Sequence, residues 1–300
     1  MTQEKDSKQS IISVSGSNNA VIQTTDNEKI SEKKSVSGQS SAKQLLTLAK
    51  AFAIDGSLLP PEKQMPLQER ADRRAYTNSQ RQQLNLESIV VKAVNYCSTS
   101  TIAEQVDADW FAQYTELAKE VSNKTMQELW AKILSKEINT PGSFAIKTLK
   151  VFKGLSIHDA KLFAKATAIA MRDNTGKQYR IISGSYQTPS IWNSFDKKRV
   201  QNIDLSKLGL HYSDLLTLAE NALLFTQETE TAPFEKGQEL GLIFQGKPIV
   251  LRSVKNNAVL KYYKLSPAGC ELARLIAEKP DEDTRQSIVS NILHHFTSNA

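Results

Sequence analysis

Two groups of basic side chains are the residues whose types and spacing could do chemistry in this chain. The first group lies on a helix that the sequence predicts between Pro66 and Cys97, and its arginines fall on one side of that helix. Such a stripe can bind phosphate groups or an acidic protein surface. The alternative is a solvated helix face with Glu69 and Asp72 as local partners. This arginine stripe consists of Arg70, Arg73, Arg74 and Arg81.

The second group follows a predicted β-hairpin in the C-terminal third of the chain. The segment from Gln245 to Lys264 contains no acidic residue. A basic wing of this kind can contact a phosphate backbone. Winged-helix-like units also serve as protein-interaction modules, so this alternative stays open. The hairpin cations are Lys247, Arg252, Lys255, Lys261 and Lys264.

Catalytic and metal-binding motifs are missing from the sequence. It contains no G-x-S-x-G, Walker A, G-x-G-x-x-G or H-E-x-x-H pattern. The His294-His295 pair is adjacent and not four residues apart, and Ser183-Gly184-Ser185 is expected in a loop. Cys97 and Cys270 have no metal-ligand neighbours, so both are expected to be core thiols. We therefore expect a protein that is not an enzyme and that has no cofactor, no metal and no catalytic residue.

The composition is that of an ordinary globular protein with a small basic excess. The 300 residues are 40% hydrophobic and 23% charged, with a formal net charge of +6. This charge permits an anionic partner such as nucleic acid but does not require one. No apolar run is long enough for a membrane helix, and the N-terminus lacks the apolar segment of a secretory signal. We expect a cytoplasmic protein that does not contact a membrane.

The elements that must position these cations are mostly helices. Helical spacing of apolar residues dominates the first half of the chain, whereas the order helix, hairpin, strand, helix follows from Leu205 onward. The predicted class is mainly α: a helical domain followed by a small α+β winged-helix-like unit. The predicted parts are a disordered tail over 1–41, in which residues 11–23 have a self-associating pattern, a helical domain over 42–173, the winged-helix-like unit over 174–280 and a C-terminal helix over 281–300.

The stretch from Val121 to Leu155 is the centre of the helical domain. Ser122 is the expected N-cap of a helix that carries Trp130, and Pro141-Gly142 ends this helix because proline cannot continue the hydrogen-bond ladder. Trp130 could line a ligand pocket, but tryptophan at helical spacing is more often part of a core. Ser156 and Asp159 form a predicted capping box for the following helix.

Several phrases of this sequence resemble an uncharacterised bacterial domain family. They are RQQLNLESIVVKA, then MQELWAKIL with a Pro-Gly break and TLKVFKGLS, and finally KYYKLSPAGCELARLI. The resemblance covers more than half of the chain and implies no catalytic motif, because the family has no assigned activity. Some loosely related helical proteins are associated with abortive infection and phage defence, and by analogy this chain is expected to be such a protein.

Two functions of different classes follow. In the first, the helical domain binds a protein partner or a second copy of the chain, as a regulatory or phage-defence module. Such binding persists at high salt because the contacts are apolar. In the second, the arginine stripe and the hairpin cations bind nucleic acid, and this binding weakens steeply with salt.

Overall fold

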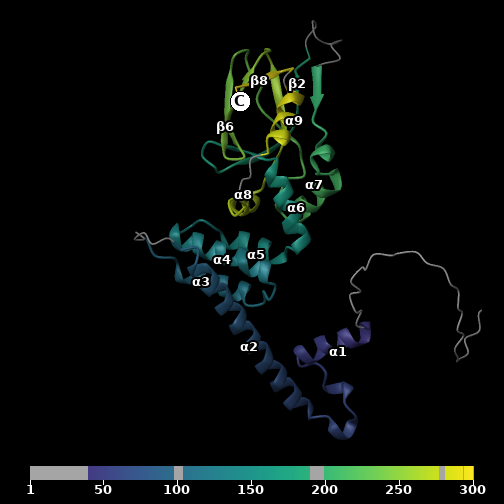
Figure 1. Ribbon diagram of the computed structural model, residues 1–300. Coiled ribbons are helices and arrows are strands. Elements are labelled where there is room, and N and C mark those ends of the chain that lie inside the picture. The colour runs from purple at the N-terminus through teal and green to yellow at the C-terminus, as the bar shows by residue number, and fades with distance from the viewer. Residues whose placement is uncertain (1–39, 98–103, 190–198, 277–280, 293, 300) are drawn as a thin grey trace, which may run out of the picture. The chain divides into compact units, whose positions relative to one another are not determined.

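The computed structural model describes residues 40–97, 104–189, 199–276, 281–292 and 294–299 (Figure 1). The chain separates into two compact units, Met1–Ala51 and Phe52–Ala300. The described part of the first unit contains helix α1 (Ser41–Ala51). The predicted tail and its segment 11–23 lie outside the described residues, except for residues 40 and 41.

The N-terminal half of the second unit is helical. Two short 3-10 turns, Gly56–Leu58 and Pro61–Lys63, precede its first long helix. The helices are α2 (Leu67–Val94), α3 (Ala108–Ala118), α4 (Lys124–Asn139), α5 (Ile146–Gly154) and α6 (Ile157–Ala168). The capping box of Ser156 and Asp159 at the start of α6 is confirmed. The N-cap of α4 is Asn123 and not Ser122, because the Asn123 side chain accepts from the N–H groups of Thr125 and Met126.

Aromatic side chains form the core of this helical layer. Trp130 is fully buried on α4 and packs edge-on against Tyr114 of α3, with ring centroids 5.3 Å apart. The Tyr114 hydroxyl donates to the carbonyl oxygen of Trp130 at 2.8 Å, and burial raises the Tyr114 pKa far above its usual range. Trp130 is therefore a core residue, as the more common interpretation of its spacing predicts.

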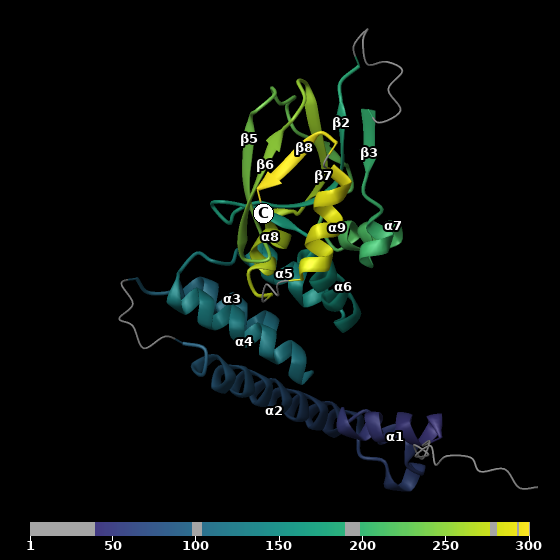
Figure 2. The same ribbon diagram turned by 45° about the horizontal axis from the view of Figure 1, so that its top comes forward.

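The C-terminal half of the second unit contains a single antiparallel sheet (Figure 2). Along its main path the order is β4-β7-β2-β1-β5-β6-β8, and β3 pairs with the end of β2 beyond the β1 contact. The strands of the described chain are β1 (Met171–Asp173), β2 (Tyr179–Gln187), β3 (Val200–Asn202), β4 (Thr229–Glu230), β5 (Glu239–Phe244), β6 (Lys247–Ser253), β7 (Ala258–Lys264) and β8 (Phe296–Asn299).

The expectation of a mainly α protein needs correction, because a sheet of this size makes the fold mixed α/β. The order of the elements, with helices first and the strands after them, is the one that the sequence predicts. The predicted hairpin is β5–β6 and the predicted third strand is β7, but β1 and β2 lie between them in the sheet. Strands β1, β3 and β8 are only three or four residues long. Such segments are too short to show an alternating pattern. A likeness to winged-helix units stays a prediction.

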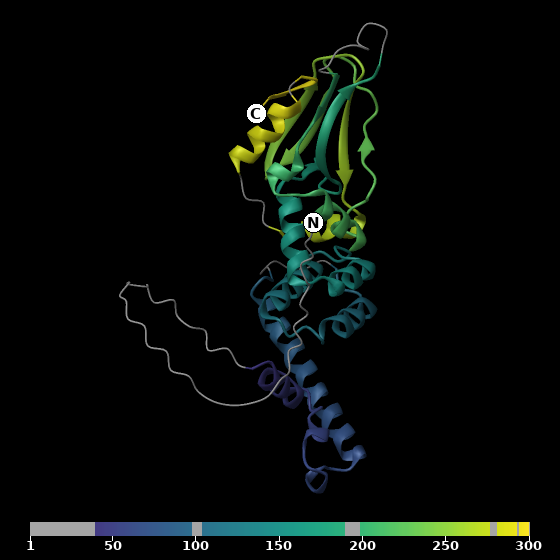
Figure 3. The same cartoon turned by 90° about the vertical axis from the view of Figure 1, so that its right-hand side faces the viewer.

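Three further helices contact or flank the sheet. They are α7 (Tyr212–Glu220), α8 (Pro267–Ala273) and α9 (Glu282–Ile292), and a 3-10 turn, Leu205–Leu208, precedes α7. Helix α8 contacts α5, whereas α9 contacts β2, β3 and β8 and lies along one face of the sheet (Figure 3).

The predicted C-terminal helix over 281–300 is only partly correct. Helix α9 ends at Ile292, and the chain turns at His294 and His295 to form β8, which pairs with β6. Phe296 follows Ile288 at helical spacing, which explains the expectation. In the structure Phe296 packs edge-on against Phe234 instead, with ring centroids 5.3 Å apart. The domain boundaries at 41, 173 and 280 stay predictions.

Candidate functional site

The arginine stripe holds the preceding segment of the chain against α2. Arg73 Nη1 lies 3.3 Å from Asp55 Oδ1, and Arg70 Nη1 donates to Ser57 Oγ at 3.0 Å. The stem of Arg70 also fills the space beside Gly56, where an added Cβ would lie 2.4 Å from Arg70 Cδ. The segment around Gly56 therefore packs closely along this side of α2.

Arg81 joins α2 to the end of α3. Its guanidinium donates to Glu120 Oε2 at 2.6 Å and to Asn78 Oδ1 at 2.6 Å, and it lies 5.2 Å from the centre of the Phe52 ring. Arg74 is exposed. The ion-pair partners of the stripe are thus Asp55 and Glu120, which are distant in sequence, and not Glu69 and Asp72.

The hairpin cations also have partners within the chain. Lys247 Nζ lies 3.7 Å from Glu282 Oε2, and Arg252 donates to Glu239 on the neighbouring strand. Lys255 Nζ lies 2.8 Å from His294 Nε2. Lys261 and Lys264 belong to β7, which β2, β1 and β5 separate from β6. The structure does not gather these cations into one wing, and their role in nucleic-acid binding stays a prediction.

A polar cluster lines an open hollow of about 410 Å³ beside β7. Ser183 Oγ donates to Glu228 Oε1 at 2.6 Å, and Lys261 Nζ lies 3.5 Å from Glu228 Oε2 and 2.9 Å from Asn202 Oδ1. Burial, and secondarily the charge of Glu228, raise the Tyr263 pKa, so its hydroxyl stays protonated. The cluster joins β2, β3 and β7 to the segment before β4 by hydrogen bonds and an ion pair.

The Ser183-Gly184-Ser185 sequence lies on strand β2 and not in the expected loop. The pairing of β2 with β7 shifts register between Ile182 and Gly184, which is the irregularity of a β-bulge. Ser185 Oγ lies 2.8 Å from His295 Nδ1, and both side chains are buried. The sequence separation of these two residues explains why no motif indicated the contact.

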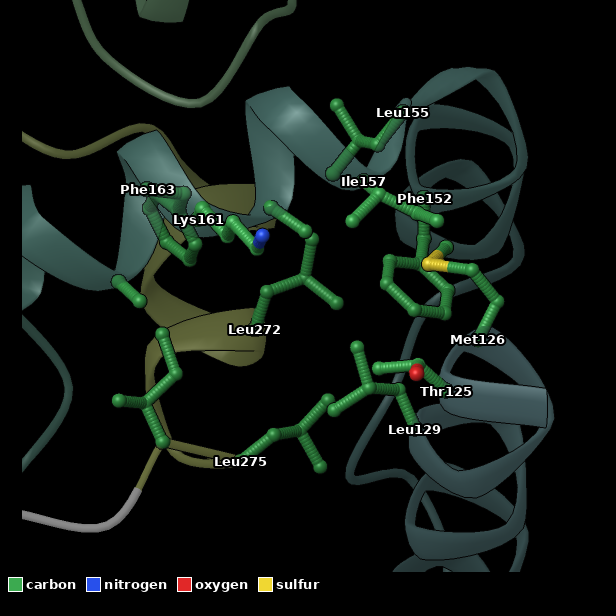
Figure 4. A pocket seen from close by; sticks show the side chains of 13 residues that line it. Thr125, Met126, Leu129, Phe152, Leu155, Ile157, Lys161, Phe163, Leu272 and Leu275 are labelled. Carbon is green, nitrogen blue, oxygen red and sulfur yellow. The ribbon is translucent and has the colours of Figure 1, made fainter. Parts of the chain in front are cut away.

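An apolar hollow of about 210 Å³ is lined by residues of α4, α5 and α6 and of the α8 end (Figure 4). Leu272 and Leu275 approach from the α8 side, and Met126 and Phe152 from the other helices. Lys161 supplies the one charged group of its lining among the described residues. The polar groups that would orient a ligand are few here, and the lining includes the exposed side chains of Thr125, Ile157 and Lys161.

A basic hollow of about 610 Å³ lies where the end of α4 meets the β1–β2 turn and the end of α8. None of its lining residues in the described chain is acidic. We call it the basic pocket. Its cationic side chains are Lys136, Arg172, Lys177 and Arg274, and the other lining residues are Thr175, Gly176, Tyr179, Ala273 and Ile276.

Metal ligands and membrane helices were also sought in the described ranges. No group of three or more His, Cys, Asp or Glu side chains that could hold a metal ion occurs in them. Helices in those same ranges are too short or too polar to cross a membrane. Cys270 is buried as expected, but the prediction for Cys97 is wrong, because its side chain is exposed at the end of α2.

One comparison with known proteins gives a match. Residues 69–289 match the family described as "Protein of unknown function (DUF2806)". The chain belongs to this family. The DUF2806 match begins in α2 and ends in α9, so it includes the sheet up to β7 and every cation discussed above. No curated protein and no solved structure matches the chain.

Membership of the DUF2806 family agrees with the resemblance to an uncharacterised domain family. The bacterial origin and the relation to abortive infection stay predictions. The basic pocket was missed by the sequence reasoning, because its cations come from three elements that are far apart in the sequence and form no local pattern. Arg172 and Lys177 flank one turn, and this pair is the only local signal that could have indicated it.

Proposed function

We propose that this DUF2806 protein is a non-enzymatic binding module that associates with a second copy of itself through α2. The observation that carries the proposal is a row of exposed side chains along that helix. Leu84, Val91 and Val94 are 65%, 67% and 65% exposed. Apolar side chains that are exposed together on one surface can mark an interaction site. Most of the exposed large apolar side chains in the described second unit lie between Phe52 and Tyr96.

The exposed row continues over five turns of α2. Its members are spaced four, four, three, four and three residues apart, which places them on one side of the helix. We call it the exposed stripe, and it consists of Tyr76, Gln80, Leu84, Glu87, Val91 and Val94. The opposite side of α2 is buried at Asn85, Ile89 and Ala93 and contacts α4. The chain's own core therefore uses only that opposite side.

A second α2 helix is the occupant that fits the exposed stripe. Spacings of three and four residues, which alternate here from Gln80 onward, are those of helices that pair side by side. Gln80 and Glu87 interrupt the apolar row, and polar residues at such positions commonly fix register and the number of helices. A contact between identical helices is self-complementary and closes as a dimer.

Sedimentation velocity of the full chain tests this proposal. We expect a dimer at about 0.1 M and at about 1 M salt, because the contact is apolar and charge screening affects it little. Leu84→Glu combined with Val91→Glu should give a monomer. Leu216→Glu changes an exposed leucine on α7 and should leave the dimer intact. A wild-type chain that stays monomeric at high protein concentration would refute the proposal.

We also propose that the protein is cytoplasmic and that it acts in phage defence. The first is supported by composition and the second by the resemblance alone. Nucleic-acid binding by the arginine stripe and the hairpin cations is the weaker alternative. Arg73, Arg81 and Arg252 already contact carboxylates of the same chain, so neutralising phosphates with them would require breaking those contacts.

A further inference from the structure

We propose that the basic pocket binds a small ligand that carries two or more phosphate groups. Ligand sites are typically hollows of this size, and phosphate groups are recognised by convergent lysine and arginine side chains. Four cations converge here from α4, from β1 and its turn, and from the end of α8. The site shares no residue with the exposed stripe, so it does not depend on the proposed self-association.

Three of the four cations of the basic pocket have no carboxylate partner among the residues that the structure describes. Lys136, Lys177 and Arg274 have no carboxylate oxygen within 4 Å of their charged nitrogens among the described residues. Arg73 and Arg81 of the arginine stripe and most of the hairpin cations, by contrast, each have a carboxylate oxygen within 4 Å. Like charges gathered in a hollow repel one another, and a bound anion would remove that repulsion.

Two described acidic residues that adjoin the basic pocket in the sequence, Glu137 and Glu271, are committed elsewhere. Glu137 follows Lys136, but its buried carboxylate accepts from the N–H groups of Gly142 and Phe144 at 2.6 and 2.9 Å. Glu271 Oε2 accepts from the N–H of Ala145 at 2.9 Å. Each carboxylate thus satisfies main-chain donors, so neither neutralises the pocket's cations directly.

Asp173 is committed in the same way within the β1–β2 turn. Its Oδ1 accepts from Thr175 Oγ1 at 2.9 Å and from the N–H groups of Lys177 and Gln178 at 3.0 and 3.3 Å. Burial opposes its ionisation, but these hydrogen bonds outweigh burial and hold the Asp173 pKa below its usual range. The ionised carboxylate therefore shapes the turn that carries Lys177.

The turn also brings Arg172 to the pocket. Gly176 has a φ of 67°, and a Cβ added there would lie 3.6 Å from Arg172 Nη1. The glycine thus allows the left-handed turn of the chain that follows Arg172. A planar guanidinium can hold two oxygens of one phosphate, while the lysines neutralise a second one.

Calorimetric titration of the full chain with inorganic triphosphate tests the proposal. We expect binding at low ionic strength that weakens as salt is added. The double variant Lys177→Gln/Arg274→Gln should raise the Kd by roughly tenfold for each cation removed. Adenosine triphosphate, titrated in parallel, shows whether a nucleotide carries the phosphates.

The matched control is Lys150→Gln/Lys165→Gln, which removes two exposed lysines of α5 and α6 that do not line the pocket. It should bind triphosphate as the wild type does. The proposal is overturned if the wild type does not bind triphosphate, or if the pocket variant binds as tightly as this control. It is also overturned if a short single-stranded oligonucleotide binds and triphosphate does not.

Discussion

Glu137 holds Phe144 by a hydrogen bond of 2.9 Å from the Phe144 N–H to the buried carboxylate of Glu137. On its other side, the carbonyl oxygen of Phe144 accepts from the indole N–H of Trp110 at 2.7 Å. Both main-chain groups of Phe144 are therefore satisfied by side chains from α4 and α3. This relationship fixes the chain between α4 and α5, where Pro141 and Gly142 break the helix.

Glu137→Ala should lower the free energy of unfolding by about 3 kcal/mol. The substitution leaves the N–H groups of Gly142 and Phe144 without their acceptor, and each such loss costs about 1–3 kcal/mol when the group is buried. Urea unfolding measures the loss. Glu116→Ala, on the exposed face of α3, is the control and should change stability by less than about 0.5 kcal/mol. Equal stability of the two variants would contradict this account.

Gly269→Ala should destabilise the protein although alanine is the better helix former. A Cβ at residue 269 would lie 2.1 Å from the carbonyl oxygen of Leu223, so α8 and the main chain at Leu223 would have to separate. We expect a loss of about 1–3 kcal/mol in thermal or urea unfolding. Gly154→Ala, at the end of α5, meets nothing within 4 Å and should be neutral or slightly stabilising. Similar losses of stability for both variants would show that α8 can move away from the main chain at Leu223 at little cost.

Glu120 should make stability depend on pH through Arg81. The hydrogen bond from Arg81 holds the Glu120 pKa below its usual value of 4.5. In the unfolded chain this carboxyl should have its usual pKa of 4.5. The stability that the ionised Glu120 gives to the folded protein is therefore complete above pH 4.5, and it is lost as the pH falls through the lower pKa of the folded state. When the pH is lowered from about 6 to about 3, the free energy of unfolding should fall less for Glu120→Gln than for the wild type, as urea unfolding at each pH can measure. In an Arg81→Met background the same substitution should change the pH dependence much less.

Alkylation should distinguish the two cysteines. Cys97 is exposed, whereas Cys270 is buried, and burial raises the pKa of the Cys270 thiol. Since the thiolate is the reactive form, Cys270 should resist iodoacetamide in the folded protein. Mass spectrometry should find one alkylated cysteine in the folded chain and two after unfolding in denaturant. Rapid modification of Cys270 in the folded chain would mean that α8 opens readily.

Helices were predictable where apolar spacing and caps agree. Ser156 and Asp159 start α6 as expected, and the side chain of Asp107 caps α3. At α4 the predicted N-cap was Ser122, whereas the N-cap in the structure is Asn123. Serine and asparagine cap helices about equally well, so the sequence cannot decide between two adjacent residues of these types. Trp130 was placed correctly because large aromatic residues at helical spacing usually lie in the core.

The sheet was only half predictable. The β5–β6 hairpin and β7 are β-prone runs beside a turn, but β1 and β8 depend on pairing partners that are distant in sequence. Local propensity carries little information about such strands. The arginine stripe shows the same difficulty for the candidate sites, because its position on α2 was predictable and its partners Asp55 and Glu120 were not.

The pairing of β2 with β7 has a consequence for how the molecule folds. The two strands meet across residues 188–257, whereas α2, α3, α4 and α5 contact one another within residues 67–154. Local contacts form early, and pairings across long loops form late because closing the loop costs chain entropy. We therefore expect the helical layer to be structured first and the sheet to be completed in a slower step. During that interval β2 presents an unpaired edge, at which two nascent molecules could aggregate.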